Sequence, residues 1–246
     1  MGVVLPALTQ DKERVMANAN LRPEASRLLA DIHEIARMET NVLFWGPPGS
    51  GKTLLATRLR KLRTNLTGQK LWETFNIWRG SGLCPTNKLA VPFRAPHHTV
   101  SLAGMVGSIS RAAVRPPAPP TAWPIRYGEL SLAHGGILLL DEIDEFTRPV
   151  LEAVRMALLR GSVFLPLPKA RRADTFEAYA GSGITAPAEF QLVATTNDLD
   201  RLKKYVSLEL RDRFSVVLDI KPDSKADLKA GRGIIQQVIA EIDLSI

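Results

Sequence analysis

The sequence of 246 residues contains one cysteine, four histidines and no long apolar segment. Cys84 has no second cysteine with which to form an internal disulfide, and so few histidines argue against a structural zinc site. No segment approaches the roughly 20 apolar residues that a membrane-spanning helix needs, and residues 1–10 lack the basic region and apolar core of a signal peptide. These absences argue against disulfide-stapled and membrane-spanning classes, and we expect a cytoplasmic protein without membrane contacts.

The overall composition is that of a basic, globular chain. Hydrophobic residues make up 45% of the sequence, which is enough for a core of ordinary size, and the length fits one α/β domain or one domain with a fragment of another. The formal net charge is +7 and the isoelectric point is near 9.7. Such a charge favours an acidic partner such as nucleic acid, but a bound nucleotide or neighbouring subunits account for it equally well.

Apolar runs alternate with helical patterns along most of the chain. Continuous apolar character is typical of strands in a sheet that is covered on both faces, and the helical patterns between them predict an α/β fold with a parallel sheet. Ligands are then expected at the carboxyl ends of the strands. Two segments are predicted to be loops or hairpin insertions: 115–124, which is rich in proline and alanine, and 165–187, which mixes prolines, basic residues and glycines. The expected strands are 41–45, 136–140, 190–196 and 214–220, and the expected helices begin near Pro23, Lys52 and Thr147.

The first expected strand runs into a phosphate-binding motif. The pattern G-x-x-x-x-G-K-[ST] lies between a strand and a helix, which is the context that it requires. Its glycines let backbone N–H groups turn toward phosphates, and the following helix N-terminus favours negative charge. We predict that Lys52 contacts the β- and γ-phosphates and that Thr53 binds Mg²⁺. The motif consists of Gly46, Pro47, Pro48, Gly49, Ser50, Gly51, Lys52 and Thr53.

Three polar residues follow later strands. Asp141 and Glu142 end the run 136–140, where Asp141 can hold Mg²⁺ and Glu142 can accept a proton from attacking water. Asn197 follows the strand 190–196 and can orient that water or the γ-phosphate, although an asparagine before an aspartate is also common in turns. Together with the phosphate loop, these residues predict ATP hydrolysis in addition to ATP binding.

Two adjacent histidines raise a second metal hypothesis. His97 and His98 have no third ligand near them in the sequence, and neighbouring residues on a strand point to opposite faces. We therefore interpret both as residues that order a loop.

With these residues in view, the sequence resembles the magnesium-chelatase and ComM branch of AAA+ ATPases over about residues 41–220. Beyond the nucleotide motifs, the resemblance rests on the stretches 92–99, 128–136 and 190–194. It implies a P-loop AAA+ core with a parallel sheet sandwiched by helices, β-hairpin insertions and a truncated C-terminal lid. The expected division is an N-terminal extension at 1–22, the ATPase core at 23–221, and a partial lid or tail at 222–246.

The resemblance also implies roles for individual residues. It implies the roles given above for Lys52, Thr53, Asp141 and Glu142 and makes Asn197 similar to the sensor-1 residue. Arg213 looks like the arginine finger, which serves the ATP of a neighbouring subunit, so a homo-oligomeric ring, usually a hexamer, is expected. Arg211 is less suited to this role. Alternatively, Arg213 only pairs with a nearby acidic residue, for which Glu209, Asp212 and Asp219 are available.

For the process that the expected Mg²⁺-dependent ATPase drives, we favour the first of three hypotheses and keep the other two as alternatives. The first is remodelling or translocation of DNA, as in ComM-type proteins, with DNA contacted by Lys169, Arg171 and Arg172 in the enlarged second hairpin. The second is an ATPase subunit that drives a protein partner, as in magnesium chelatase. The third is a regulatory ATP-binding protein with a reduced lid.

Overall fold

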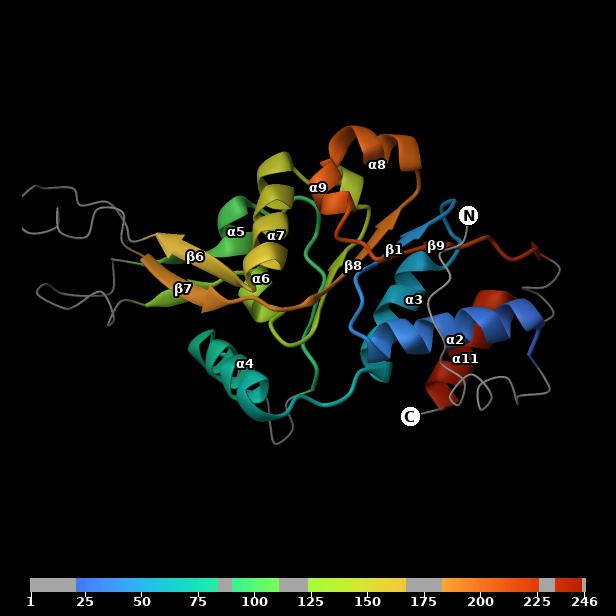
Figure 1. Cartoon of the computed structure of the whole chain (residues 1–246), viewed down its shortest axis with the longest axis horizontal. Helices are drawn as coiled ribbons and strands as arrows, with labels where there is room; N and C mark the ends of the chain where they lie inside the picture. Colours follow the sequence, from blue (N-terminus) through green and yellow to red (C-terminus); the bar gives the residue numbers. More distant parts are fainter. Residues whose placement is uncertain (1–20, 84–89, 111–123, 167–182, 226–232, 245–246) are drawn as a thin grey trace, which may run out of the picture.

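The computed structural model describes residues 21–83, 90–110, 124–166, 183–225 and 233–244. At its centre lies a five-stranded sheet in the order β2-β5-β8-β1-β9, in which all neighbouring strands are parallel (Figure 1). Four of these strands match the apolar runs of the sequence, and the fifth, β2, was not predicted. The strands are β1 (Val42–Trp45), β2 (Phe93–Arg94), β5 (Ile137–Leu140), β8 (Gln191–Thr196) and β9 (Val216–Asp219).

Helices cover both faces of the sheet, so the predicted α/β fold class is confirmed. One face packs against α5 (Leu102–Val106), α6 (Glu129–Leu132), α7 (Arg148–Arg160), α8 (Leu199–Tyr205) and α9 (Leu208–Arg211). The other face packs against α2 (Pro23–Arg37), α3 (Lys52–Leu59) with the 3₁₀ turn η1 (Arg60–Leu62), and α11 (Ile234–Leu244). A further helix, α4 (Gly68–Gly80), lies against α6. None of the described helices combines the length and apolar character needed to cross a membrane.

The strands supply side chains to both hydrophobic cores. Leu138 and Leu140 of β5 enter the core on the α7 side, whereas Ile137 and Leu139 enter the core on the α3 side. Because successive residues of a strand point to opposite faces, a strand covered on both sides needs apolar side chains on both of its faces. All four residues of β5 are buried. This requirement explains why the runs were continuous rather than alternating.

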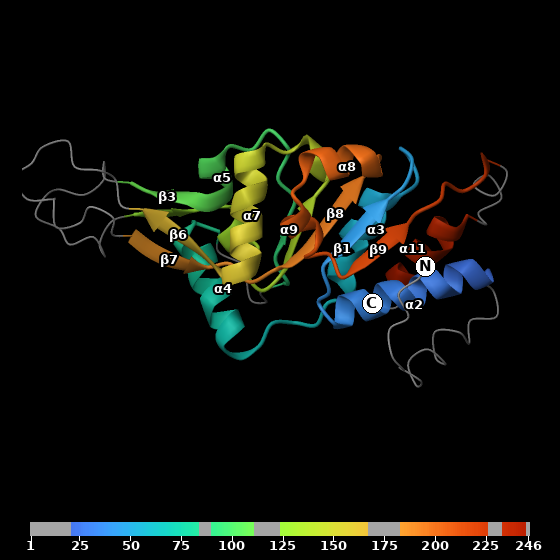
Figure 2. The same cartoon turned by 45° about the horizontal axis from the view of Figure 1, so that its top comes forward.

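Two β-hairpins extend from one end of the molecule (Figures 1 and 2). Strands β3 (Gly107–Ile109) and β4 (Ile125–Tyr127) form one, and β6 (Ser162–Pro166) and β7 (Gly183–Pro187) form the other. Their stems share a small hydrophobic cluster of Ile109, Leu165 and Ala186. The hairpin insertions are thus confirmed in their stems, while Lys169, Arg171 and Arg172 lie outside the described residues.

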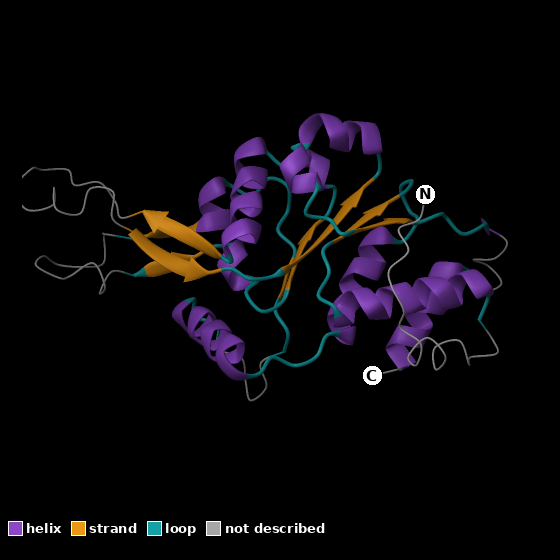
Figure 3. Ribbon diagram, in the orientation of Figure 1, coloured by secondary structure: helices purple, strands orange, loops and turns teal. Residues whose placement is uncertain are grey.

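The described end of the chain packs beside the phosphate loop. Both carboxylate oxygens of Asp223 accept hydrogen bonds at the start of α11, from Ile234 N (2.7 Å) and Ile235 N (3.3 Å). Ile235 is buried, and its side chain lies so close to Gly51 that a Cβ atom at Gly51 would come within 2.7 Å of Ile235 Cγ2. Helix α11 also packs against α2 (Figure 3). It therefore belongs to the same hydrophobic core as α2 and α3, although the predicted boundary at 221–222 stays a prediction.

Candidate nucleotide-binding and catalytic site

Two glycines of the loop between β1 and α3 occupy positions where a side chain would not fit. Gly46 has φ +148°, and a Cβ atom there would lie 2.2 Å from the carbonyl oxygen of Ile220. Gly51 has φ +89° and is packed against Ile235. A side chain at Gly46 would collide with the backbone of Ile220 and one at Gly51 with the side chain of Ile235, and both backbone conformations disfavour residues other than glycine. The two glycines let the chain turn sharply from the carboxyl end of β1 into the N-terminus of α3.

Lys52 is the first residue of α3 and is only 6% exposed. Its Nζ atom donates hydrogen bonds to Gly46 O (2.7 Å), Pro47 O (2.8 Å) and Ser50 Oγ (3.4 Å). Burial lowers the pKa of the Lys52 ammonium, and the nearby carboxylates of Asp141 and Glu142 partly offset this effect. An anionic partner would stabilise the charged form of this lysine, which burial disfavours. The loop thus holds its ammonium group at the place where phosphate oxygens would supply that partner.

Thr53 and Asp141 meet across the loop and the neighbouring strand end. Thr53 Oγ1 donates a hydrogen bond to Asp141 Oδ1 at 2.9 Å. A hydroxyl and a carboxylate are hard oxygen donors, which Mg²⁺ prefers, and Mg²⁺ in nucleotide sites uses one or two carboxylates together with substrate phosphates. The donor set fits a Mg²⁺ ion bound with a nucleotide. Thr53 and Asp141 would be its protein ligands.

Glu142 has an unusual backbone conformation. Its φ of +54° is left-handed, which few residues other than glycine adopt. Its exposed carboxylate accepts a hydrogen bond from Asn197 Nδ2 at Oε1 (2.8 Å). A strained backbone of this kind persists only where the surrounding contacts hold it, and such residues cluster at functional sites. The structure therefore brings Glu142 and Asn197 together at the edge where Lys52, Thr53 and Asp141 also lie.

Arg213 lies at the amino ends of the parallel strands, whereas the phosphate loop follows the carboxyl end of β1. Arg213 precedes β9, whose first residue, Val216, pairs with Val42 at the start of β1. The side-chain amide of Asn41 donates to the carbonyl oxygen of Arg213 at 3.1 Å and so fixes its backbone at this edge. Within the described residues, the Arg213 guanidinium forms no ion pair with Glu209, Asp212 or Asp219. Arg213 is thus placed away from the phosphate loop of its own chain.

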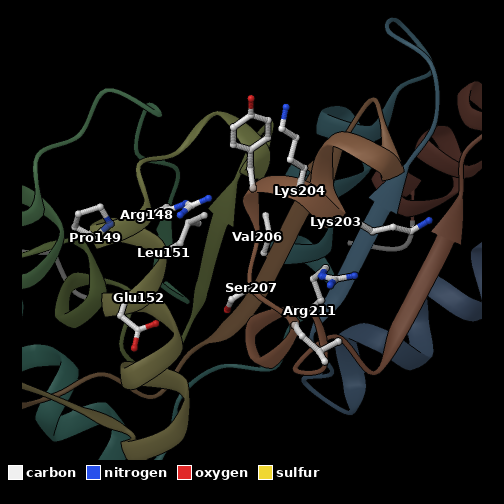
Figure 4. Close-up of a pocket in the computed structure, with 11 residues that line it drawn as sticks. Arg148, Pro149, Leu151, Glu152, Lys203, Lys204, Val206, Ser207 and Arg211 are labelled. Carbon is white, nitrogen blue, oxygen red and sulfur yellow. The ribbon is translucent and has the colours of Figure 1, made fainter.

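A basic cleft that the sequence did not single out is lined by Arg211, two residues before Arg213 in the sequence. Its walls come from the first turn of α7, the end of α8 and the short helix α9 (Figure 4). The only signal in the sequence was the charged stretch 201–213, whose folding against α7 could not be read from spacing alone. Four basic side chains line the cleft, namely Arg148, Lys203, Lys204 and Arg211.

The two adjacent histidines do not point to opposite faces, so that expectation was wrong. His97 and His98 lie in the turn after β2, where the pleat of a strand no longer separates neighbours, and their ring centroids are 4.0 Å apart. His97 Nδ1 is 2.9 Å from Thr99 Oγ1 within the same turn. Across the described ranges, no group of three or more histidine, cysteine or acidic side chains is arranged to hold a metal ion.

Comparison with known protein families gives a match over most of the chain. The family model of the magnesium chelatase subunit ChlI matches residues 30–227. The competence protein ComM of Haemophilus influenzae is 38% identical over 159 residues, and protein YifB of Escherichia coli is 38% identical over 164 residues. In each case the alignment covers 64% of this chain and 26% of the relative. The chain thus spans about a quarter of the length of these curated relatives.

Among solved structures, NtrX from Brucella abortus has a similar fold. It superimposes with a TM-score of 0.54 over 89% of this chain and 41% of NtrX, at 16% sequence identity. A structure of NtrX in complex with ADP gives a TM-score of 0.51 over 86% of this chain and 39% of NtrX, also at 16% identity. At this identity the likeness concerns the fold alone.

Proposed function

The chain belongs to the family of the magnesium chelatase subunit ChlI, and from this premise we propose that it binds and hydrolyses ATP with Mg²⁺. One observation carries the proposal. Five residues lie together at the carboxyl ends of the strands, namely Lys52, Thr53, Asp141, Glu142 and Asn197. A phosphate loop alone would support binding only. The carboxylate of Glu142, held by Asn197 close to that loop, supports hydrolysis.

The proposed reaction is an attack by water on the γ-phosphorus of ATP. A new bond forms between the water oxygen and phosphorus, the bond to the β–γ bridging oxygen breaks, and ADP leaves with that oxygen. Glu142 accepts the proton of the water, and Asn197 orients the Glu142 carboxylate. Lys52 exchanges its carbonyl partners in the loop for oxygens of the β- and γ-phosphates. A Mg²⁺ ion held by Thr53 and Asp141 would neutralise charge on the same phosphates.

Replacement of Lys52 by alanine tests the nucleotide site. Lys52→Ala is expected to abolish tight binding of Mg-ATP, because the phosphates lose the only lysine of the loop. Isothermal titration with ATP and Mg²⁺ measures the effect. Lys61→Ala is the matched control, since this lysine is exposed and pairs with Asp243. Equal affinities of the wild type and Lys52→Ala for Mg-ATP would mean that Lys52 does not contact the phosphates.

We further propose that the ATPase forms a ring that acts on DNA. The support is the net charge of +7 and the three cations Lys169, Arg171 and Arg172 between β6 and β7. The second hypothesis, a protein partner, is an outcome of the experiment that follows, whereas a regulatory role would be indicated by ATP binding without phosphate release.

Neutralising Lys169, Arg171 and Arg172 together should weaken binding to DNA of any sequence. Each lost phosphate contact is expected to reduce the slope of log affinity against log salt by roughly 0.7 to 0.9. Fluorescence anisotropy at several salt concentrations measures both quantities. The matched control neutralises three exposed cations elsewhere, Arg27, Arg37 and Lys61. An unchanged slope in the first variant, with a normal circular dichroism spectrum, would favour the protein partner.

A further inference from the structure

Thr195, a residue of β8, stands between the two acidic residues of the site. It is 1% exposed, and its hydroxyl is 2.6 Å from Asp141 Oδ1. The same hydroxyl oxygen accepts a hydrogen bond from the backbone N–H of Glu142 at 2.9 Å. Side chain and backbone of neighbouring acidic residues thus converge on one buried hydroxyl group.

The direction of these hydrogen bonds follows from their chemistry. A backbone N–H can only donate, so the Thr195 oxygen accepts from Glu142. The single hydroxyl proton of Thr195 is then free to be donated to the carboxylate of Asp141. Thr53 donates to the same Asp141 oxygen, so Oδ1 has two hydroxyl donors. This arrangement fixes the orientation of the Asp141 carboxylate.

The contact with Glu142 has a second consequence. Glu142 holds a left-handed backbone conformation, and such a conformation costs of order 1–3 kcal/mol unless its surroundings determine it. The bond from Glu142 N to Thr195 stabilises this conformation from inside the protein. The bond from Asn197 holds the carboxylate end of the same residue. Residues of the strand β8 and its end therefore hold Glu142 at both its backbone and its side chain.

We infer that Thr195 is a positioning residue that orients Asp141 for Mg²⁺ and Glu142 for the attacking water. The inference rests on the proposed function, because it presupposes a bound Mg²⁺ ion and an attacking water. Thr195 itself takes no part in the chemistry. Its neighbour Thr196 is also fully buried but donates to Asp144 instead, on the other side of the strand. Comparing variants of the two threonines therefore distinguishes two effects: the loss of any buried hydroxyl group, and the loss of the specific contacts to Asp141 and Glu142.

The test compares Thr195→Val, Thr195→Ser and Thr196→Val. Valine replaces the hydroxyl by a methyl group, whereas serine retains it. Binding of a fluorescent, non-hydrolysable ATP analogue is titrated with Mg²⁺, and kcat for ATP is measured in parallel. Thr195→Val should raise the Mg²⁺ concentration for half-maximal binding by about 10- to 100-fold and lower kcat by a similar factor, as for other groups that orient metal ligands. Thr195→Ser and Thr196→Val should stay close to wild type in Mg²⁺ dependence.

Several results would overturn the inference. These are a wild-type Mg²⁺ dependence in Thr195→Val, an equal change in Thr196→Val, or a failure of serine to restore what valine removes. Thr195→Ala serves as the second variant if Thr195→Val does not fold, and melting temperatures identify that case. A wild-type protein that binds the analogue with Mg²⁺ but releases no phosphate from ATP would contradict the proposed hydrolysis alone. The role of Thr195 in Mg²⁺ binding would still be tested by the titration, which needs no hydrolysis.

Discussion

Glu142→Gln is expected to bind ATP as the wild type does but to hydrolyse it about 10² to 10⁴ times more slowly, the usual range for loss of a general base. Glutamine keeps the side-chain oxygen that accepts the hydrogen bond from Asn197, so the side chain can stay in place. What it loses is the ability to take the proton of the attacking water. A single-turnover measurement with prebound ATP separates this loss from any change in binding.

Glu145→Gln is the matched control for this variant. Glu145 lies three residues further along the chain, is exposed and pairs with Arg201. Its neutralisation changes the local charge by the same amount without touching the carboxylate held by Asn197. Turnover near the wild-type rate in Glu142→Gln would mean that another group accepts the proton.

Arg213→Ala is expected to lower hydrolysis by about 10³-fold or more if Arg213 acts on the ATP of a neighbouring subunit, as arginine fingers do in other phosphoryl-transfer proteins. The position of Arg213 before β9, at the edge opposite the phosphate loop of the same chain, supports a role in a neighbouring site. Its own ATP affinity should change little. The measurement is the steady-state rate of phosphate release at saturating ATP.

Mixing two inactive variants tests the shared site. Lys52→Ala subunits lack the loop lysine but keep Arg213, and Arg213→Ala subunits have the reverse defect. A mixed oligomer then contains some sites with both residues, and it should recover part of the activity. Arg211→Ala is the comparison for a nearby arginine, since Arg211 lines the basic cleft of Figure 4. No recovery in a demonstrated mixed oligomer would contradict the shared site.

The fold was largely predictable because its central strands β1, β5 and β8 are buried. The runs that became β1 and β5 are continuous and apolar, those that became β8 and β9 are mostly apolar, and short runs of this kind between helical patterns are typical of parallel strands. Strand β2 consists only of Phe93 and Arg94, both half-buried, and so short a strand has no periodic signal. The short helices α5, α6 and α9 were missed for the same reason.

The site was predictable where its signal is local and not where it depends on strand register. Lys52 and Thr53 belong to one continuous motif, and Asp141, Glu142 and Asn197 follow strand ends. Thr195 belongs to no motif and does not follow a strand end, so nothing in the sequence points to it. It meets Asp141 only because Leu140 of β5 pairs with Ala194 of β8, which makes the next residues neighbours. The roles of the site residues, including the contacts of Lys169, Arg171 and Arg172 with DNA, stay predictions.

The most direct test of the central claim is the rate of phosphate release per subunit, measured for the wild-type protein with ATP and Mg²⁺ over a range of protein concentrations. Because the proposed site combines Lys52 and Glu142 of one chain with Arg213 of another, the rate per subunit should rise with protein concentration and level off once the oligomer has formed. No phosphate release at any concentration, from a folded protein that binds ATP, would contradict the assignment of this chain as an ATPase.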